Sequence, residues 1–286
     1  MADFATLDGI RTQYKISGSG IPLLLMAPSA FDSSISRWRM VGVWKEMRPL
    51  ETLAADFQVI AYDRREAGQS HGRIEQLSWE SYARHAKELL DHLGIQRALV
   101  MGGCMGCSVA LAFGSAYPQT CAGLLLHWPV GGFRWLQRAH GIFDMHIAFA
   151  RAQGLGAVAE RAMKSGLFWN DPESGPWSAP IANDPEFRAV FVKQDLNTYL
   201  ALVDKIKHAL FHDTMPSGVS GAQLLAMKLP AYIMPGNDPA HSLSSSHALR
   251  ELLPQAQMAD PLPPAQTPDL VRQWIIDSGK AAWNAG

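Results

Sequence analysis

The 286-residue sequence predicts an α/β fold, in which a doubly wound and mainly parallel β-sheet carries an inserted helical cap. Short apolar runs such as Ile21–Met26 and Phe57–Tyr62 alternate with longer segments of helical spacing. Strands of a parallel sheet are apolar throughout because both of their faces are buried. Between about residues 131 and 228 this alternation stops, and only helical stretches can be recognised.

The first half of the chain begins with a turn signal, Asp8-Gly9, between two short β-prone segments, which predicts a hairpin over residues 6–16. Strands are expected over residues 21–26 and 57–62. A helix over residues 78–93 follows from its apolar stripe, with Ser78 as the N-cap and a glycine after its end.

The later elements follow the same rhythm. We expect strands at 98–102, 122–128, 230–234 and 256–259, and helices at 108–117, 244–252 and 268–276. Inside the cap, helical stretches are expected at 141–151, 156–164, 181–192 and 194–211. The core is therefore predicted to comprise residues 1–130 and 229–286, with 131–228 as a cap or lid. A separate helical domain is the less favoured alternative, because the sheet pattern resumes after it.

Composition narrows the possible partners and location. The formal charge is −1, so nothing suggests nucleic acid or an anionic membrane as a partner. The N-terminal residues lack the apolar core of a signal peptide. The long uncharged stretch 98–122 is broken by glycines and Pro118, which favours a buried strand and helix over a membrane span. Three clustered cysteines are too few for a disulfide framework, and we expect a reducing, cytoplasmic location.

Residues 102–106, Gly-Gly-Cys-Met-Gly, stand between two apolar runs and predict a strand that turns at once into a helix. Small residues must flank such a turn, and the side chain at its tip is forced outward beside the helix N-terminus. The first helical N–H groups and the helix dipole favour a thiolate there. Cys104 is therefore the expected nucleophile, and the Met105 N–H is an expected oxyanion donor.

This pattern resembles the Gly-x-nucleophile-x-Gly elbow of the α/β-hydrolases, with cysteine where serine is usual. Residues 63–70 resemble the turn D-x-R-G-x-G-x-S of that superfamily. Gly236-Asn237-Asp238 resembles the place of the triad acid, and residues 23–30 resemble the strand and oxyanion loop. The resemblance covers nearly the whole chain and implies the α/β-hydrolase fold. Dienelactone hydrolases share a cysteine nucleophile, whereas the large cap is more similar to ester and C–C bond hydrolases.

Two departures from that pattern concern the oxyanion loop and the neighbouring turn. Met26-Ala27-Pro28-Ser29 replaces the usual His-Gly pair, and Pro28 has no N–H to donate. Either Ser29 supplies the second donor or the oxyanion hole depends on Met105 alone. Glu66 stands where the turn has glycine, and we expect it to pair with Arg64 or Arg65 rather than to act in catalysis.

A third departure is larger: the catalytic histidine of the superfamily should follow the last strand, but residues 260–267 contain none. Two candidates remain open. His241 lies three residues beyond Asp238, and His127 ends the strand after the elbow, beside Trp128. Each could instead be a histidine that is hydrogen-bonded at a strand end. Asp238 could orient His241, bind substrate, accept a proton or cap the following helix.

Other interpretations of these motifs are weaker. Cys104-x-x-Cys107 spells a redox motif, but the strand order does not fit a thioredoxin-like fold, and Cys107 is expected to pack in the helix. The glycines match a dinucleotide fingerprint poorly, and no spacing suggests a metal site, so no cofactor or metal is expected. His85 and His92 are assigned to a surface helix.

We therefore expect a hydrolase that acts on an ester, lactone or thioester of a small apolar or aromatic acid through a Cys104 acyl-enzyme. Cap residues that suggest such a substrate include Phe143, Met145, Phe168, Trp169 and Trp177. One alternative is non-hydrolytic chemistry, such as C–C cleavage, a lyase step or acyl transfer. Another is a non-catalytic small-molecule-binding protein. The sequence does not specify an oligomeric state.

Overall fold

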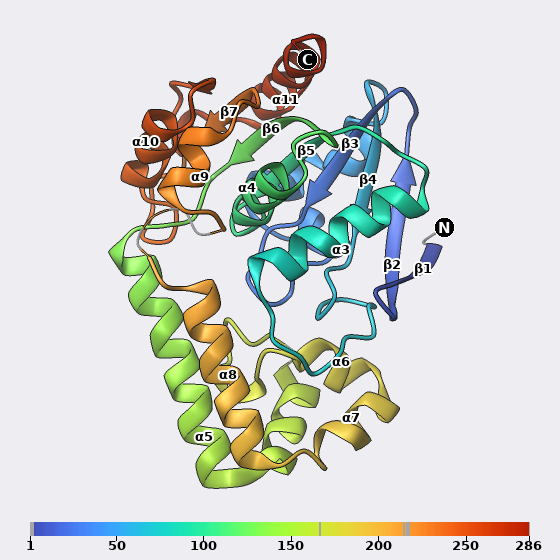
Figure 1. Ribbon diagram of the computed structural model, residues 1–286, viewed down its shortest axis with the longest axis vertical. Helices are drawn as coiled ribbons and strands as arrows, with labels where there is room; N and C mark the ends of the chain where they lie inside the picture. Colours follow the sequence, from blue (N-terminus) through green and yellow to red (C-terminus); the bar gives the residue numbers. More distant parts are fainter. Residues whose placement is uncertain (1–2, 166, 214, 216–217, 286) are drawn as a thin grey trace.

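The computed structural model describes residues 3–165, 167–213, 215 and 218–285, and it contains one eight-stranded sheet. The strand order is β1-β2-β4-β3-β5-β6-β7-β8 (Figure 1). The β1 and β2 strands form the predicted hairpin, and β2 runs antiparallel to β4, whereas the other neighbours are parallel. The strands are β1 Asp3–Leu7, β2 Ile10–Ser17, β3 Ile21–Met26, β4 Phe57–Tyr62, β5 Ala98–Gly103, β6 Cys121–His127, β7 Ala231–Met234 and β8 Ala256–Met258.

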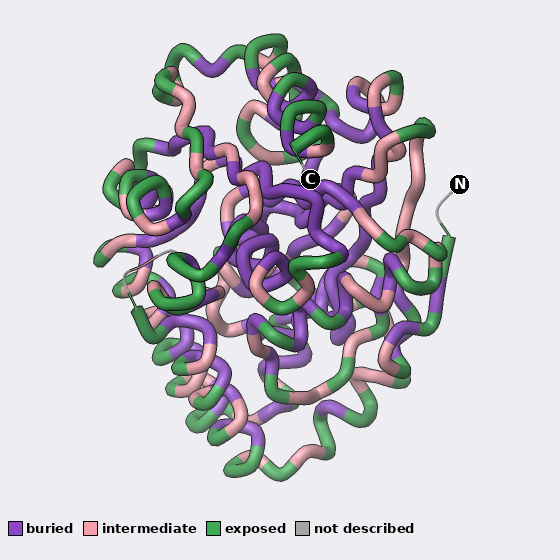
Figure 2. The backbone as a smooth tube through the Cα atoms, turned by 45° about the horizontal axis from the view of Figure 1, so that its top comes forward, coloured by how far each residue is buried: buried purple, intermediate pink, exposed green. Residues whose placement is uncertain are grey.

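Helices cover both faces of this sheet, as a doubly wound fold requires. On one face, α3 and α4 pack over Leu24, Val100 and Leu124, and on the other face α1 and α11 pack over Leu99 and Leu125. The central strands β4, β5 and β6 are buried along nearly their whole length (Figure 2), which is why they are mostly apolar runs. The core helices are α1 Gly42–Met47, α2 Pro49–Thr52, α3 Trp79–His92, α4 Gly106–Ala116, α9 Gly221–Ala226, α10 Leu243–Leu252 and α11 Pro268–Asn284.

The segment between β6 and β7 contains no strand among its described residues. Before the core helix α9, its described residues form α5 Phe133–Ser165, α6 Ser178–Asn183, α7 Pro185–Phe191 and α8 Leu196–Leu210. They gather below the sheet in Figure 1, with α5 packed along α8. Short 3-10 turns lie at Ile35–Arg39, Pro172–Ser174 and Pro263–Ala265.

Several predicted boundaries in this segment are wrong. The expected helices at 141–151 and 156–164 both lie within α5 and are separated, as predicted, by non-helical backbone at Gly154, whose φ is 79°, but the first of them begins earlier, at Phe133. The expected helix at 181–192 is two helices, because Asp184 has extended backbone and caps α7, which begins with Pro185. The short helices α1, α2 and α9 lack a periodicity long enough to reveal them.

The helix α3 begins at its expected cap, where the Ser78 side chain accepts a hydrogen bond from the Ser81 N–H. The prediction that His85 lies on the surface of this helix is wrong. His85 is fully buried, and its Nε2 lies 2.8 Å from Thr12 Oγ1 on β2. Burial lowers the pKa of His85 to about 3, so this histidine is a neutral hydrogen-bonding group of the core.

Candidate active site

The turn between β5 and α4 has the geometry expected of a nucleophile elbow. Cys104 stands at its tip with φ at 54°, in the left-handed region that non-glycine residues rarely occupy. A Cβ on Gly102 would lie 2.5 Å from the Cys107 nitrogen, and one on Gly106 would lie 2.1 Å from the Met26 carbonyl oxygen. The glycines are thus required because strand, turn and helix approach one another more closely than a side chain allows.

Substitution at Gly106 is expected to disrupt this turn. In Gly106→Ala the new methyl group meets backbone that cannot rotate away, and we expect a loss of about 2–3 kcal/mol in the free energy of unfolding. Gly141→Ala in α5 is the matched control, since a Cβ there meets nothing within 4 Å. Denaturant unfolding followed by circular dichroism measures both variants. Equal stability of the two variants would contradict the close approach.

His241 and Asp238 lie in the loop after β7. Because β5 and β7 run parallel, this loop is at the same end of the sheet as the elbow, the end formed by the carboxyl ends of the strands. His241 Nδ1 is 2.7 Å from Asp238 Oδ2. The other carboxylate oxygen of Asp238 accepts the N–H groups of Ala240 and His241. Asp238 does not cap the helix that follows, because Ser242 is the N-cap of α10. The carboxylate therefore shapes its own loop and orients the imidazole.

The other ring nitrogen of His241, Nε2, is buried and has no hydrogen-bond partner among the described residues. The ring is nevertheless close enough to Cys104 that the thiol raises the pKa of His241 and His241 lowers the pKa of the thiol. The fold thus brings together a cysteine, a carboxylate and a histidine. Their order in the chain is Cys104, Asp238, His241, and the histidine follows the acid by only three residues.

The electrostatics of these three groups favour their charged forms. Burial disfavours the imidazolium, but Cys104 and Asp238 outweigh it and raise the pKa of His241 to about 10. Burial also opposes ionisation of Cys104, yet His241 and nearby backbone N–H groups hold the pKa of this thiol below its usual value. The hydrogen bond from His241 lowers the pKa of Asp238. A thiolate–imidazolium pair beside a carboxylate is the arrangement that these shifts favour.

Two backbone amides also influence the Cys104 thiol. The N–H groups of Met105 and Ser29 both lower the pKa of this thiol. Ser29 has φ at 87°, a left-handed conformation that turns its amide toward the elbow. Pro28, which has no N–H, lies buried just before it. The residue after the proline therefore has a backbone N–H close to Cys104, where Pro28 has none.

The ring of His127 belongs to a different network. His127 is fully buried, its Nδ1 accepts a hydrogen bond from Trp44 Nε1 at 2.8 Å, and its Nε2 is 3.3 Å from Gln266 Oε1. Burial lowers the pKa of His127 to about 3. Both ring nitrogens are occupied away from the Cys104 thiol, whereas the His127 carbonyl oxygen accepts the Cys104 N–H. The structure therefore brings His241, and not the His127 ring, to the sulfur.

Gln266, which sequence reasoning missed, occupies the loop after the last strand. Its Oε1 accepts the indole N–H of Trp128 at 2.5 Å, and its Nε2 donates to the Pro235 and Pro261 carbonyl oxygens. The ring of Trp128 lies 5.7 Å from the His241 ring. A glutamine just before a helix that starts with Pro268 gives no signal of this role. Gln266 stands where the superfamily pattern has its histidine, and its side chain holds the Trp128 ring beside His241.

Glu66 forms the ion pair that the sequence predicts, and the partner is Arg64. The Arg64 Nη2 atom is 2.5 Å from Glu66 Oε1, and both side chains are almost fully buried. Tyr82 donates its hydroxyl to the same carboxylate oxygen at 3.1 Å. Arg64 in turn donates to the Ala30 carbonyl oxygen, one residue after Ser29. The buried pair therefore anchors the segment that contains Ser29 and Ala30, through the hydrogen bond from Arg64.

The inserted helices meet the core near this loop. Phe31, just after Ser29 in the chain, packs edge-to-face on Phe143 and Phe168. A small cavity of about 80 Å³ lies between Ser29 and the inserted segment, and Trp169 and Asn170 line its far side. Met145, one of the predicted pocket residues, is 55% exposed, and Phe143, Phe168 and Trp177 are buried in packing.

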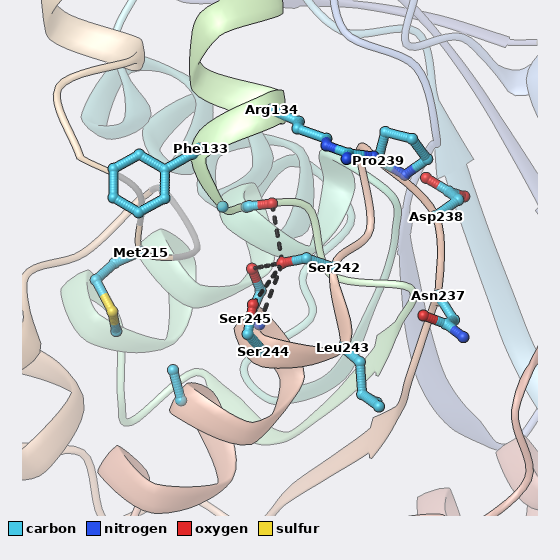
Figure 3. Close-up of a pocket in the computed structure, with 13 residues that line it drawn as sticks. Phe133, Arg134, Met215, Asn237, Asp238, Pro239, Ser242, Leu243, Ser244 and Ser245 are labelled. Carbon is cyan, nitrogen blue, oxygen red and sulfur yellow. Dashed lines mark hydrogen bonds between the residues drawn. The ribbon is translucent and has the colours of Figure 1, made fainter.

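A second, larger cleft of about 630 Å³ lies on the outer side of the Asp238 loop (Figure 3). Phe133 and Met215 line one side of it, and Asp238 and Ser242 the other. Cys104 does not line this cleft. Within the described parts of the chain, no cluster of three His, Cys, Asp or Glu side chains is arranged to hold a metal ion.

Comparison with known proteins supports the fold over the whole chain. A thermophilic esterase from Thermogutta terrifontis superposes with a TM-score of 0.62 at 22% identity, covering 99% of both chains. A meta-cleavage product hydrolase from Pseudomonas fluorescens IP01 gives a TM-score of 0.65 at 18% identity, covering 98% of both. Residues 29–148 match the alpha/beta hydrolase fold family.

The chain therefore has the α/β-hydrolase fold, as its strand order also indicates. Among curated relatives, a soluble epoxide hydrolase from Corynebacterium sp. (strain C12) is 34% identical over 109 residues, which is 38% of this chain and 35% of that protein. The matched stretches span about a third of the length of such relatives. No helix among the described residues is long and apolar enough to cross a membrane.

Proposed function

We propose that this protein is a hydrolase that cleaves an ester, lactone or thioester of a small molecule through a covalent Cys104 acyl-enzyme. The observation that carries the proposal is the convergence on one sulfur of an imidazole held by a carboxylate and of two backbone N–H groups. Nucleophile, base and orienting acid within reach of one another are the signature of covalent catalysis. The hydrolases among its structural neighbours agree with this class of reaction.

In the first half of the reaction, the Cys104 thiolate attacks the substrate carbonyl carbon, and the C=O electron pair moves to the oxygen. The Met105 and Ser29 N–H groups, which lower the pKa of the thiol, lie beside this position and stabilise the oxyanion. The His241 imidazolium donates its proton to the departing alkoxide or thiolate as the tetrahedral intermediate collapses. The products of this step are a thioester on Cys104 and a neutral His241.

In the second half, neutral His241 removes a proton from water, and the resulting hydroxide attacks the thioester carbonyl. Collapse of the second intermediate releases the acid and restores the thiolate–imidazolium pair. Asp238 keeps its charge throughout, and it holds the imidazole so that Nε2 faces the reacting atoms.

The helices inserted between β6 and β7 act as the lid over this site in the proposed function. Phe31, next to the oxyanion loop, is packed on Phe143 and Phe168 of the inserted segment, and Trp169 lines the cavity beside Ser29. These aromatic surroundings suit a small apolar or aromatic acyl group.

The nucleophile is tested by mass spectrometry of the intact protein after exposure to an activated ester such as p-nitrophenyl butyrate. We expect one acyl group on the wild type and none on Cys104→Ala. Cys107→Ala is the matched control. Burial raises the pKa of the Cys107 thiol, and this thiol donates a hydrogen bond to the Gly102 carbonyl oxygen, so we expect no acylation there. Equal labelling of wild type and Cys104→Ala would refute the proposal.

The fate of the acyl group is followed in heavy-oxygen water. Hydrolysis incorporates one solvent oxygen into the released acid, whereas transfer to another acceptor or a lyase reaction leaves the product without it. Incorporation that disappears in Cys104→Ala is the expected result. Product without solvent oxygen would replace hydrolysis by transfer or lyase chemistry at the same nucleophile.

A further inference from the structure

The loop that carries His241 is bonded to the segment that leads into the inserted helices. Gly131 and His241 pair as a parallel β-bridge, and the Gly131 N–H donates to the Ala240 carbonyl oxygen at 3.1 Å. The Ser242 hydroxyl donates to the Gly131 carbonyl oxygen at 3.2 Å. In Figure 3 Ser242 lies below the start of α5, and the dashed lines that meet at its hydroxyl include those to Ser244 and Ser245.

The same hydroxyl also fixes the start of α10. Ser242 Oγ accepts the Ser245 N–H at 3.3 Å and lies 2.6 Å from Ser245 Oγ. Gly132 follows Gly131 in the linker, the segment 128–132 between β6 and α5. Its φ is 92°, and a Cβ there would lie 2.8 Å from Ser242 Oγ. Ser242, directly after His241 in the chain, therefore contacts the linker, the loop and the helix at once.

This position matters because of where the histidine stands. Asp238 fixes the loop from within, through its bonds to the Ala240 and His241 N–H groups. The ring of His241 faces Cys104, Asp238 and the neutral His127, but none of these ring interactions holds the backbone against the rest of the protein. That restraint comes from Gly131 on one side and from the α10 cap on the other.

We propose that Ser242 is a positioning residue, which holds the Gly131 carbonyl so that the His241 ring meets the Cys104 thiol. Because Gly131 and Gly132 lead into α5, movement of the inserted helices is transmitted through this contact to His241. The inference rests on the proposed function for its catalytic meaning, but the geometry that it describes can be tested without turnover.

The test is the pH dependence of Cys104 alkylation by iodoacetamide, with peptide mapping to identify the modified thiol. In Ser242→Ala the apparent pKa of the thiol should rise, and alkylation at pH 7 should slow about three- to tenfold, which corresponds to one lost hydrogen bond. Ser242→Thr should restore the wild-type profile. Ser220→Ala is the control, because Ser220 caps α9 in the same way, away from His241.

A second variant approaches the contact from the linker. Gly132→Ala should slow alkylation in the same direction, since its Cβ would displace Ser242 Oγ. Gly154→Ala is the matched control: it lies in α5 with φ at 79°, and its Cβ would meet nothing within 4 Å. Unchanged pH profiles in both Ser242→Ala and Gly132→Ala, with melting temperatures lowered as in the controls, would overturn the inference.

The two proposals fail in different experiments. An acyl group that labels Cys104→Ala as well as wild type refutes the proposed function and leaves the alkylation result intact. Normal acylation of Cys104, together with an alkylation profile that Ser242 does not influence, refutes the positioning role alone.

Discussion

Replacing His241 with alanine is expected to lower the rate of Cys104 acylation by about 10²- to 10⁴-fold, the range that a positioned general acid–base group contributes. The leaving group then departs without a proton, and the thiol loses the group that stabilises its anion. Stopped-flow release of p-nitrophenol measures this step. His247→Ala is the control, since His247 is exposed on the neighbouring α10 helix.

The difference in acylation rate between wild type and His241→Ala should depend on pH. In the wild type the pKa of the thiol is lowered and that of His241 is raised to about 10, so the thiolate–imidazolium pair persists between the two values. As the pH falls through the lowered thiol pKa the thiolate is lost. His241→Ala should hold its thiolate only at higher pH, so the difference from wild type is largest on the acidic side and disappears above pH 10. Parallel profiles would contradict the ion pair.

Replacing Glu66 with glutamine is expected to lower the free energy of unfolding by about 3–5 kcal/mol, because it leaves a buried arginine without its counter-charge. Arg64 and Glu66 are both nearly inaccessible to water, and although burial disfavours the charged guanidinium, the Glu66 carboxylate outweighs this and raises the pKa of Arg64. The loss of anchorage at the Ala30 carbonyl should also weaken the oxyanion loop. Urea unfolding measures the stability change.

Two controls separate the buried charge from its neighbours. Glu51→Gln breaks an ion pair with Arg39 at half-exposed side chains, where a loss of less than about 1 kcal/mol is expected. Tyr82→Phe removes one hydroxyl from the same cluster and should cost about 1 kcal/mol. A Glu66→Gln variant as stable as Glu51→Gln would rule out a structural role for the buried pair.

The fold was predictable because its signals are local. Apolar runs such as Ile21–Met26 are long enough to identify buried strands, and the glycines at 102, 103 and 106 identify a turn that admits no side chain. Helix boundaries within residues 131–228 were less accurate. There the first helix begins earlier than expected, at Phe133, and Asp184 divides an expected single helix in two, which depends on the backbone conformation of one residue.

The candidate site was predictable only in part. The elbow and Asp238 follow from motif and position, and His241 follows from its nearness to Asp238 in the chain. His127 was the second, less favoured candidate, at a strand end, and only the packing of Trp44 and Gln266 around its ring assigns it to another network. No local pattern predicts the role of Gln266. Its side chain contacts His127, Trp128, Pro235 and Pro261, which only the tertiary structure brings together.

The sequence by itself determined the sheet, the elbow and the cysteine at its tip, because close backbone approach and strand burial restrict which residues can stand there. The tertiary structure alone decided which histidine faces the sulfur, that the Ser29 N–H lies close to Cys104, and that the base-bearing loop is joined to the linker of the inserted helices. These depend on distances between segments that lie far apart in the sequence, such as Gly131 and Ser242. Such distances are set by packing and not by any pattern along the chain.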